Sequence, residues 1–189
     1  MLFRSGADPR LKVPVAAGRA RRHRTVTTPR WSAVFLAFFL VGAALRGIDV
    51  WRPVDGSIRN DWREADVAAM ARNFYREGMD IRYPRIDWRG RGPGFVESEF
   101  PLYPWTVAWL YRAFGLREEL ARVLSYLFSL AALGVFIALA RHLLSPFAAA
   151  GATLFYVLSP MEIRLATAIQ PEPLMLLAYL TAEIGRAHV

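Results

Sequence analysis

The sequence predicts an all-α, polytopic membrane protein, and the distribution of its apolar residues supports this prediction. These residues are concentrated in blocks at 31–45, 123–140, 147–161 and 174–182, with Arg-rich polar sequence between them. A helix needs about 20 apolar residues to cross a hydrocarbon core of roughly 30 Å, and Val123–Ala140 supplies eighteen residues without a charge. The blocks at 31–45 and 147–161 have fifteen residues each and need flanking residues to reach that length. Several such blocks are hard to fit into the soluble core of a 189-residue chain.

Charge and cysteine content narrow the classes of function. The formal net charge is +8, nearly all of it from arginine, but the sequence has no compact basic motif for recognising nucleic acid. Anionic lipid headgroups and phosphates are therefore the expected partners of these arginines. The chain has no cysteine, which excludes disulfides and thiolate chemistry.

Residues 1–30 are predicted to form a disordered, basic cytoplasmic tail. They contain Pro, Gly and the arginine cluster at 19–24, and they show no hydrophobic periodicity. The positive-inside rule then places the start of the first helix, at about 31–48, in the cytoplasm. A cleaved signal peptide is the alternative, but the charged region is long and no clear small-x-small cleavage site follows it.

The polar segment at 49–121 is predicted to be a long extracytoplasmic loop that carries two helices. An apolar stripe at helical spacing predicts the first helix over about 62–77, with capping signals before it and Gly78 after it. The stripe consists of Val67, Met70, Ala71, Phe74 and Tyr75. The second helix is expected at about 104–114, where aromatic side chains are typical of a helix that lies in the membrane interface.

Three further helices are expected at about 122–144, 146–165 and 174–182. The short basic turn Arg141–His142 places the first connection between them in the cytoplasm. The loop that contains Glu99 and the start of the fourth spanning helix at Glu172 therefore emerge on the same, outer side. This topology would allow two carboxylates more than seventy residues apart to share a site.

The end of the chain is unusual. Residues 183–189 interrupt the fourth spanning helix after about nine apolar residues, too few to cross a membrane. Their sequence resembles a translated sequencing adapter. We therefore expect residues 31–182 to be the N-terminal part of a longer protein and residues 183–189 to be a non-native tail.

Two acidic clusters are candidates for chemistry. In the first, Asp61, Glu64 and Asp66 can either cap the predicted helix or provide a general base, and their spacing does not choose between these roles. In the second, Glu97 is expected to be solvated. Glu99 lies against an aromatic run, where a carboxylate needs a partner such as an arginine or a divalent cation.

Other charged residues are candidates for binding. Glu172 is either a helix-start carboxylate or a substrate contact. Arg63 and Arg85, with neighbouring arginines of the loop, have the planar guanidinium that binds phosphate bidentately. The histidines form no metal-binding motif.

Several of these features together resemble the membrane glycosyltransferases of the GT-C class. They are the first helix, the long external loop with an acidic motif before Ala71–Tyr75, the run Glu99–Trp105, and the acidic residue that opens the fourth spanning helix. The resemblance covers about residues 32–182. It is strongest to protein O-mannosyltransferases and bacterial lipid A aminoarabinose transferases.

The resemblance implies transfer of a hexosyl or pentosyl group from a polyprenyl-phosphate donor to a lipid, glycan or protein acceptor, outside the bacterial cytoplasmic membrane. Glu64, with Asp61 or Asp66 as alternatives, would act as the base. Glu99 and Glu172 would bind substrate, and a divalent ion on these two residues is compatible with the family. Phe100 stands where the family usually has lysine. The fragment alone is expected to be inactive.

A polytopic transporter or a lipid-binding scaffold without catalysis is the alternative interpretation. A transporter is expected to carry ionisable residues near the middle of its spanning helices. Val123–Ala140 contains none. This difference favours an enzyme whose site lies at the membrane interface.

Overall fold

The computed structural model describes residues 30–51 and 62–187, which form seven helices. Within these residues no β-strand forms, and only an isolated antiparallel bridge joins Arg85 to Phe95. The all-α prediction is therefore confirmed for this part of the chain. The helices are α1 (Trp31–Gly47), α2 (Trp62–Glu77), α3 (Leu102–Phe114), α4 (Glu119–Leu143), α5 (Pro146–Leu158), α6 (Pro160–Leu165) and α7 (Glu172–Ala187).

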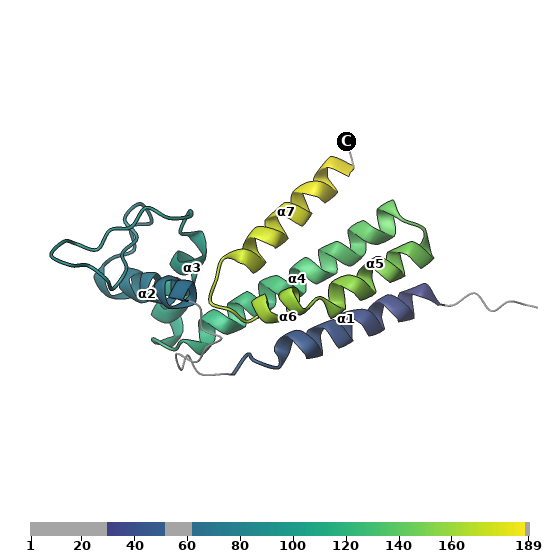
Figure 1. Ribbon diagram of the computed structural model, residues 1–189, viewed down its shortest axis with the longest axis horizontal. Helices are drawn as coiled ribbons and strands as arrows, with labels where there is room; N and C mark the ends of the chain where they lie inside the picture. The colour runs from purple at the N-terminus through teal and green to yellow at the C-terminus, as the bar shows by residue number, and fades with distance from the viewer. Residues whose placement is uncertain (1–29, 52–61, 188–189) are drawn as a thin grey trace, which may run out of the picture.

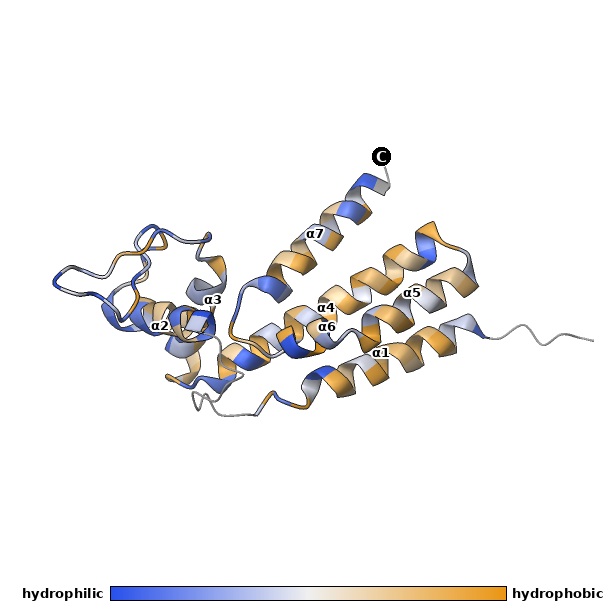
Figure 2. Ribbon diagram, viewed as in Figure 1, coloured by the Kyte–Doolittle hydropathy of each residue, from blue (hydrophilic) through white to orange (hydrophobic). Residues whose placement is uncertain are grey.

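Helices α1, α4 and α5 lie side by side and form an apolar bundle (Figure 1). Figure 2 shows that apolar residues are concentrated on these three helices, whereas α2 and the loop after it are mainly polar. The core of the bundle contains Phe35, Leu133, Ile137, Ala149 and Val157. Gly42 allows α1 to approach closely, because a Cβ atom at this position would lie 2.7 Å from Leu133 Cδ2.

Helix α4 is the one helix in the described ranges that is long and apolar enough to cross a membrane. It has 25 residues, which corresponds to a length of roughly 37 Å at about 1.5 Å per residue. The apolar helices α1 and α5 are shorter, with 17 and 13 residues. Length therefore supports membrane insertion directly for α4 alone.

The prediction of a single helix over 146–165 was wrong. Helix α5 ends at Leu158, and α6 begins at Pro160 after an extended residue, Ser159, with φ −60° and ψ 116°. Proline has no amide hydrogen and disfavours helical geometry in the residue before it. The break therefore follows from Pro160.

Arg46 caps the C-terminal end of α5 at this break. Its side chain is 1% exposed, and its guanidinium donates to the carbonyl oxygens of Tyr156 and Val157 at 3.1 and 3.3 Å. The guanidinium carbon also lies 5.1 Å from the centre of the Tyr156 ring. Arg46 thus satisfies carbonyl groups that have no partner within α5.

The α2–α3 lobe, which consists of α2, the loop at 78–101 and α3, lies at one end of the bundle (Figure 1). The predicted apolar stripe of α2 faces α3, and the lobe's core also receives Ala121 from α4 and Ile169. Both helices end at glycines with positive φ, 140° at Gly78 and 84° at Gly115. The predicted bounds of α2 are confirmed, while α3 begins two residues earlier than expected.

Helix α7 packs against α4 and diverges from the rest of the bundle toward its C-terminus (Figure 1). It begins at Glu172, two residues before the predicted start, and continues to Ala187. The predicted tail at 183–189 therefore starts inside this helix. The predicted N-terminal tail lies outside the described residues, except for Arg30.

Candidate functional site

Arg63, Glu99 and Glu172 form one ion-pair cluster. Arg63 Nη2 donates to Glu99 Oε1 at 2.6 Å, and Arg63 Nη1 lies 2.8 Å from Glu172 Oε1. All three side chains are partly exposed, with Glu99 the most exposed at 51%. Segments that are far apart in sequence thus meet at a single guanidinium, which has the fork geometry needed to bind two carboxylates.

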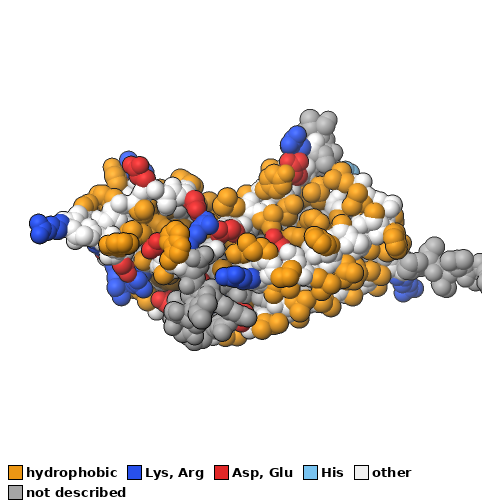
Figure 3. All heavy atoms as spheres, in the orientation of Figure 1, with side chains coloured by type: hydrophobic (Ala, Val, Ile, Leu, Met, Phe, Trp, Pro, Cys, Tyr) orange, Lys and Arg blue, Asp and Glu red, His pale blue; other side chains and the backbone are white. Residues whose placement is uncertain are grey.

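Local structure explains how each member of the cluster is placed. Arg63 lies in the first turn of α2, and Glu99 lies in the irregular segment before Pro101, which precedes α3. Glu172 lies in the first turn of α7, where the positive end of the helix dipole stabilises a carboxylate. In Figure 3, acidic and basic side chains gather at the hollow between the α2–α3 lobe and α7.

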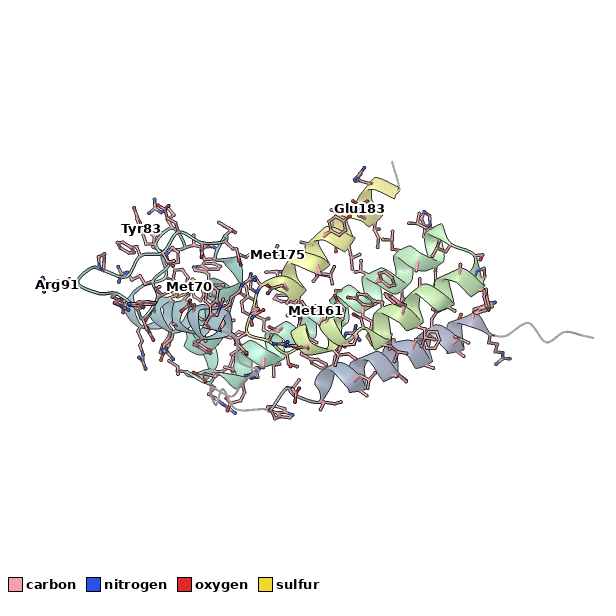
Figure 4. All side chains as sticks on the ribbon, viewed as in Figure 1. Met70, Tyr83, Arg91, Met161, Met175 and Glu183 are labelled. Atoms are coloured by element: carbon pink, nitrogen blue, oxygen red, sulfur yellow. The ribbon has the colours of Figure 1, made fainter. Side chains whose placement is uncertain are left out.

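An apolar cavity of about 430 Å³ adjoins this cluster. Glu172 belongs to both, and its Oε2 atom is buried without a hydrogen-bond partner in the described structure. A buried carboxylate oxygen without a partner is unusual and can accept a hydrogen bond from a ligand. The cavity is lined by residues of α4, α6, α7 and the segment before α7: Ser129, Glu162, Leu165, Ala166, Glu172, Pro173, Met175, Leu176 and Tyr179. In Figure 4, Met175 lies near the start of α7, at the α2–α3 lobe.

The structure turns Glu64 away from this cluster. Its side chain is 6% exposed and lies 2.9 Å from Arg122 Nη1, in a buried ion pair between α2 and α4. The same Glu64 oxygen, Oε1, accepts the backbone N–H of Ile169 at 3.1 Å. A general base must reach an acceptor hydroxyl, and Glu64 is engaged in the protein interior instead. The assignment of Glu64 as the base therefore does not fit this geometry.

Asp61 and Asp66 are the alternatives to Glu64 as the general base. Asp66 is half-buried, two residues further along α2. Asp61, and therefore its predicted capping role, lies outside the described residues. Glu97 is exposed, in agreement with the expectation that it is solvated.

Arg85 has a different partner from the one expected for a phosphate-binding residue. It lies 2.6 Å from Glu77, which also binds Arg89, and its guanidinium stacks over the Phe95 ring at 4.8 Å. It lines a second, polar pocket of about 220 Å³ together with Tyr83. Figure 4 shows Tyr83 in the loop of the lobe. The ion-pair partner of Arg85 is thus Glu77, and not a member of the Arg63 cluster.

The Glu77 contacts strongly favour the charged form of this carboxylate. Hydrogen bonds from Arg89 and Arg85 lower the pKa of Glu77 to about 2. A hydrogen bond from Arg82 likewise lowers the pKa of Asp80 to about 2. The Glu77 ion pairs connect the loop to the end of α2, the Asp80–Arg82 pair lies within the loop, and both stabilise the loop conformation at neutral pH.

The geometry of Glu99 and Glu172 does not fit a divalent ion. Both carboxylates bind the Arg63 guanidinium, which stands between them where a shared ion would have to lie. Within the described ranges, no group of three or more His, Asp or Glu side chains is arranged to hold a metal. We derive no chemical step through a metal at this position.

Comparison with family models, curated proteins and solved structures gave no match. Similarity to the GT-C class therefore rests on the sequence motifs alone. The spatial meeting of Glu99 and Glu172 agrees with the topology expected from the sequence, while their chemical roles stay predictions.

Sequence reasoning missed several residues around the site. Arg122, Ser125 and Tyr103 form a buried polar network, and Glu162 faces the apolar cavity. Arg122 carries a signal that could have been used, because a charge at the edge of an apolar helix needs a partner. Ser125 and Tyr103 are uncharged and lie in apolar stretches of the sequence, so nothing in the sequence indicates that they need a partner.

Proposed function

We propose that this chain forms the donor-site region of a membrane glycosyltransferase that uses a polyprenyl-phosphate-linked sugar. One observation carries the proposal: the Arg63 cluster and the apolar cavity meet at Glu172. A polyprenyl phosphate has matching parts, because its apolar chain is joined to one anionic phosphate head. A ligand across this junction would place its chain against α4, α6 and α7 and its head near Arg63.

We further propose that the bundle is inserted in the bacterial cytoplasmic membrane, with the α2–α3 lobe outside. Large apolar side chains are exposed on the outer surfaces of α1, α4 and α5, which is costly in water and favourable in lipid. They include Leu36, Leu40, Leu127, Leu143, Phe147 and Phe155. Arg141 and His142 lie at the opposite end of α4 from the lobe, which agrees with the positive-inside rule.

Arg63 would supply the cation that the GT-C pattern leads one to expect beside Glu99. Phe100 is 72% exposed and has no charge to offer a phosphate. Arg63 instead contacts Glu99 directly from α2. A guanidinium can bind a phosphate in the same bidentate way as it binds two carboxylate oxygens.

The charge balance of the cluster indicates how a donor would enter. Among the described residues of the cluster, two glutamates share one arginine, which disfavours a phosphate unless one carboxylate leaves the guanidinium. Glu99 is the more exposed of the two, so we expect the phosphate to replace Glu99 on Arg63. The released carboxylate would then be available as a base.

The proposed reaction is a direct displacement at the anomeric carbon of the donor sugar. A carboxylate, Glu99 or one of the acidic residues Asp61 and Asp66, takes the proton of the acceptor O–H or N–H. The acceptor atom forms a bond to the anomeric carbon while the bond from this carbon to the phosphate oxygen breaks. The lipid phosphate leaves with the electron pair, and Arg63 stabilises its charge.

Binding of radiolabelled polyprenyl phosphate to the purified protein in nanodiscs tests the donor site. We expect saturable binding that Arg63→Met weakens by about tenfold or more, since hydrogen bonds to a charged group contribute about 1.5–3 kcal/mol. Arg76→Met is the matched control, because Arg76 is exposed in the last turn of the same helix. Equal binding of uncharged polyprenol would contradict the proposed phosphate contact.

Transfer of a labelled sugar from the lipid to a water-soluble acceptor, measured with a full-length enzyme that contains this chain, tests the reaction itself. We expect transfer in the wild type and its loss in Glu99→Gln. Saturable phosphate-dependent binding without transfer to any acceptor class would favour the alternative function, a lipid-binding scaffold.

A further inference from the structure

The segment between α6 and α7 is held by side chains from α2 and α4. Arg122 Nη1 donates to the Thr167 carbonyl oxygen at 3.0 Å, and the Ser125 hydroxyl donates to the Ala168 carbonyl oxygen at 2.6 Å. The next residue, Ile169, donates its N–H to Glu64 Oε1 at 3.1 Å. Three consecutive residues are thus fixed through their backbone, and the segment is largely buried.

The ion pair at the centre of this network is costly to bury. The Glu64 and Arg122 side chains are each 6% exposed, so both lose most of their hydration on folding. An apolar pair of similar volume usually stabilises a protein as well as or better than a buried ion pair. The ion pair is therefore weak evidence for a role in stability alone, and the observation that remains is its contact with the backbone of Thr167 and Ile169.

Glu172 follows three residues after this segment and is bound to the same turn of α2. Arg63 contacts the Glu172 carboxylate, and the adjacent Glu64 contacts the backbone that leads into α7. The first turn of α2 therefore fixes both the carboxylate of Glu172 and the position of the helix that carries it.

The network also reaches the segment that carries Glu99. The Tyr103 hydroxyl lies 2.6 Å from Ser125 Oγ and 3.0 Å from the Ala121 carbonyl oxygen. Tyr103 is fully buried in the first turn of α3, four residues after Glu99. Burial raises the pKa of Tyr103, so its hydroxyl keeps its proton and remains a hydrogen-bond donor.

We propose that Glu64, Arg122 and Ser125 are positioning residues, which hold the segment at 167–169 so that Glu172 faces both Arg63 and the apolar cavity. The inference rests on the proposed function for its catalytic consequence. It replaces the role of Glu64 as a base with a role in geometry. Glu64 acts on the substrate only through the placement of Glu172.

The decisive variant replaces the buried pair with apolar side chains, Glu64→Met/Arg122→Met. Its thermal midpoint should fall, because the Ile169 N–H and the Thr167 carbonyl oxygen lose their partners, but no unpaired charge is left inside. The chain has no cysteine, so spin labels at Arg76→Cys on α2 and Ala178→Cys on α7 can report the distance between these helices. We expect the distance distribution to widen by about twofold or more as the fixed arrangement is lost.

Steady-state kinetics of a full-length enzyme that contains this chain provide the second readout. A misplaced substrate-positioning group such as Glu172 lowers the rate of the chemical step more than it lowers binding, because the reacting atoms are no longer aligned. We expect kcat of the double variant to fall by about tenfold or more, with KM changed by less than about threefold. An exposed pair on the lobe loop, Asp80→Asn/Arg82→Met, is the matched control and should change neither the distances nor the kinetics.

A folded double variant with an unchanged distance distribution would overturn the proposal. If the double variant does not fold, Ser125→Ala tests the same idea, since it removes the Ala168 contact and leaves the ion pair intact. An unchanged distribution in that variant would equally overturn it. The distance measurement needs no activity, so absence of transfer in the wild type would count against the proposed function alone.

Discussion

Arg63 and Glu64 are neighbours in the first turn of α2, yet their side chains lie in different surroundings. Arg63 binds two partly exposed carboxylates at the hollow, whereas Glu64 binds a buried arginine and a backbone amide. The two ion pairs are therefore expected to differ in their effect on stability and on ligand binding. One helical turn links the candidate site to the interior of the protein.

Removing Arg122 should destabilise the protein far more than removing Arg63. Arg122→Met leaves the Glu64 carboxylate buried without its cation, which we expect to lower the free energy of unfolding by about 3–5 kcal/mol. Arg63→Met breaks partly exposed pairs and should cost about 1 kcal/mol or less. Denaturant titration in mixed micelles, followed by circular dichroism, measures both values. Similar losses for the two variants would contradict the difference in burial described here.

Replacing Arg46 should destabilise the end of α5. Arg46→Met leaves the carbonyl oxygen of Val157 without its donor, whereas Tyr156 still accepts the N–H of Ser159 at 3.3 Å. A buried unsatisfied group costs about 1–3 kcal/mol, so we expect a loss of this size, measured by the same titration. Arg76→Met, on the exposed side of α2, serves as the control and should stay within about 0.5 kcal/mol of the wild type.

Two glycine substitutions should have opposite effects. Gly42→Ala places a Cβ atom 2.7 Å from Leu133 Cδ2 and 3.3 Å from Val157 Cγ2, and this overpacking should cost about 1–3 kcal/mol. Gly151→Ala meets no atom within 4 Å and should stabilise α5 by about 0.5–1 kcal/mol through helix propensity. Thermal unfolding of both variants in the same detergent checks the signs. A stabilising Gly42→Ala would show that α1 does not pack as described.

Lowering the pH should destabilise the conformation of the loop at 78–101, because Glu77 becomes protonated. The pKa of Glu77 is lowered from 4.5 to about 2, so its stabilising effect is fully present above about pH 4.5 and is lost as the pH falls through about 2. Glu77→Gln lacks this effect at every pH. Pepsin cleavage near Tyr83 and Phe95 should therefore be faster in Glu77→Gln than in the wild type at pH 5.

The ratio of the two cleavage rates isolates Glu77, because the activity of pepsin and other carboxylates affect both proteins alike. We expect this ratio to approach one as the pH falls toward 2. Asp87, whose pKa is also lowered, retains its contacts with Asn73 and Arg72 in both proteins. A ratio that does not change with pH would show that the loop does not depend on the Glu77 ion pairs.

Local sequence signals predicted much of the fold. The stripe of α2 and the glycine after it specified that helix correctly, because apolar spacing and capping act within a few residues. The meeting of Glu99 and Glu172 followed from counting membrane crossings. The break at Pro160 was also present in the sequence, but the apolar composition on both sides of it led to the prediction of one helix.

The roles of individual carboxylates could not be read from spacing. Asp61, Glu64 and Asp66 lie within six residues and are chemically alike, and the buried direction of Glu64 depends on its contact with Arg122 on α4. Arg122 is 58 positions from Glu64, and no local pattern links them. Arg63 was expected to bind phosphate, whereas its two carboxylate partners were recognisable only in three dimensions.

The break after α5 has a consequence for the lipid around the proposed site. Thirteen residues span roughly 20 Å, about two thirds of a typical hydrocarbon core. In the proposed membrane orientation, the layer beside α5 would have to become thinner to match so short a helix. Phosphate headgroups would then sink toward the level of Arg46 and α6. A lipid-linked sugar in this thinner region would have to move a shorter distance out of the bilayer to reach Glu172.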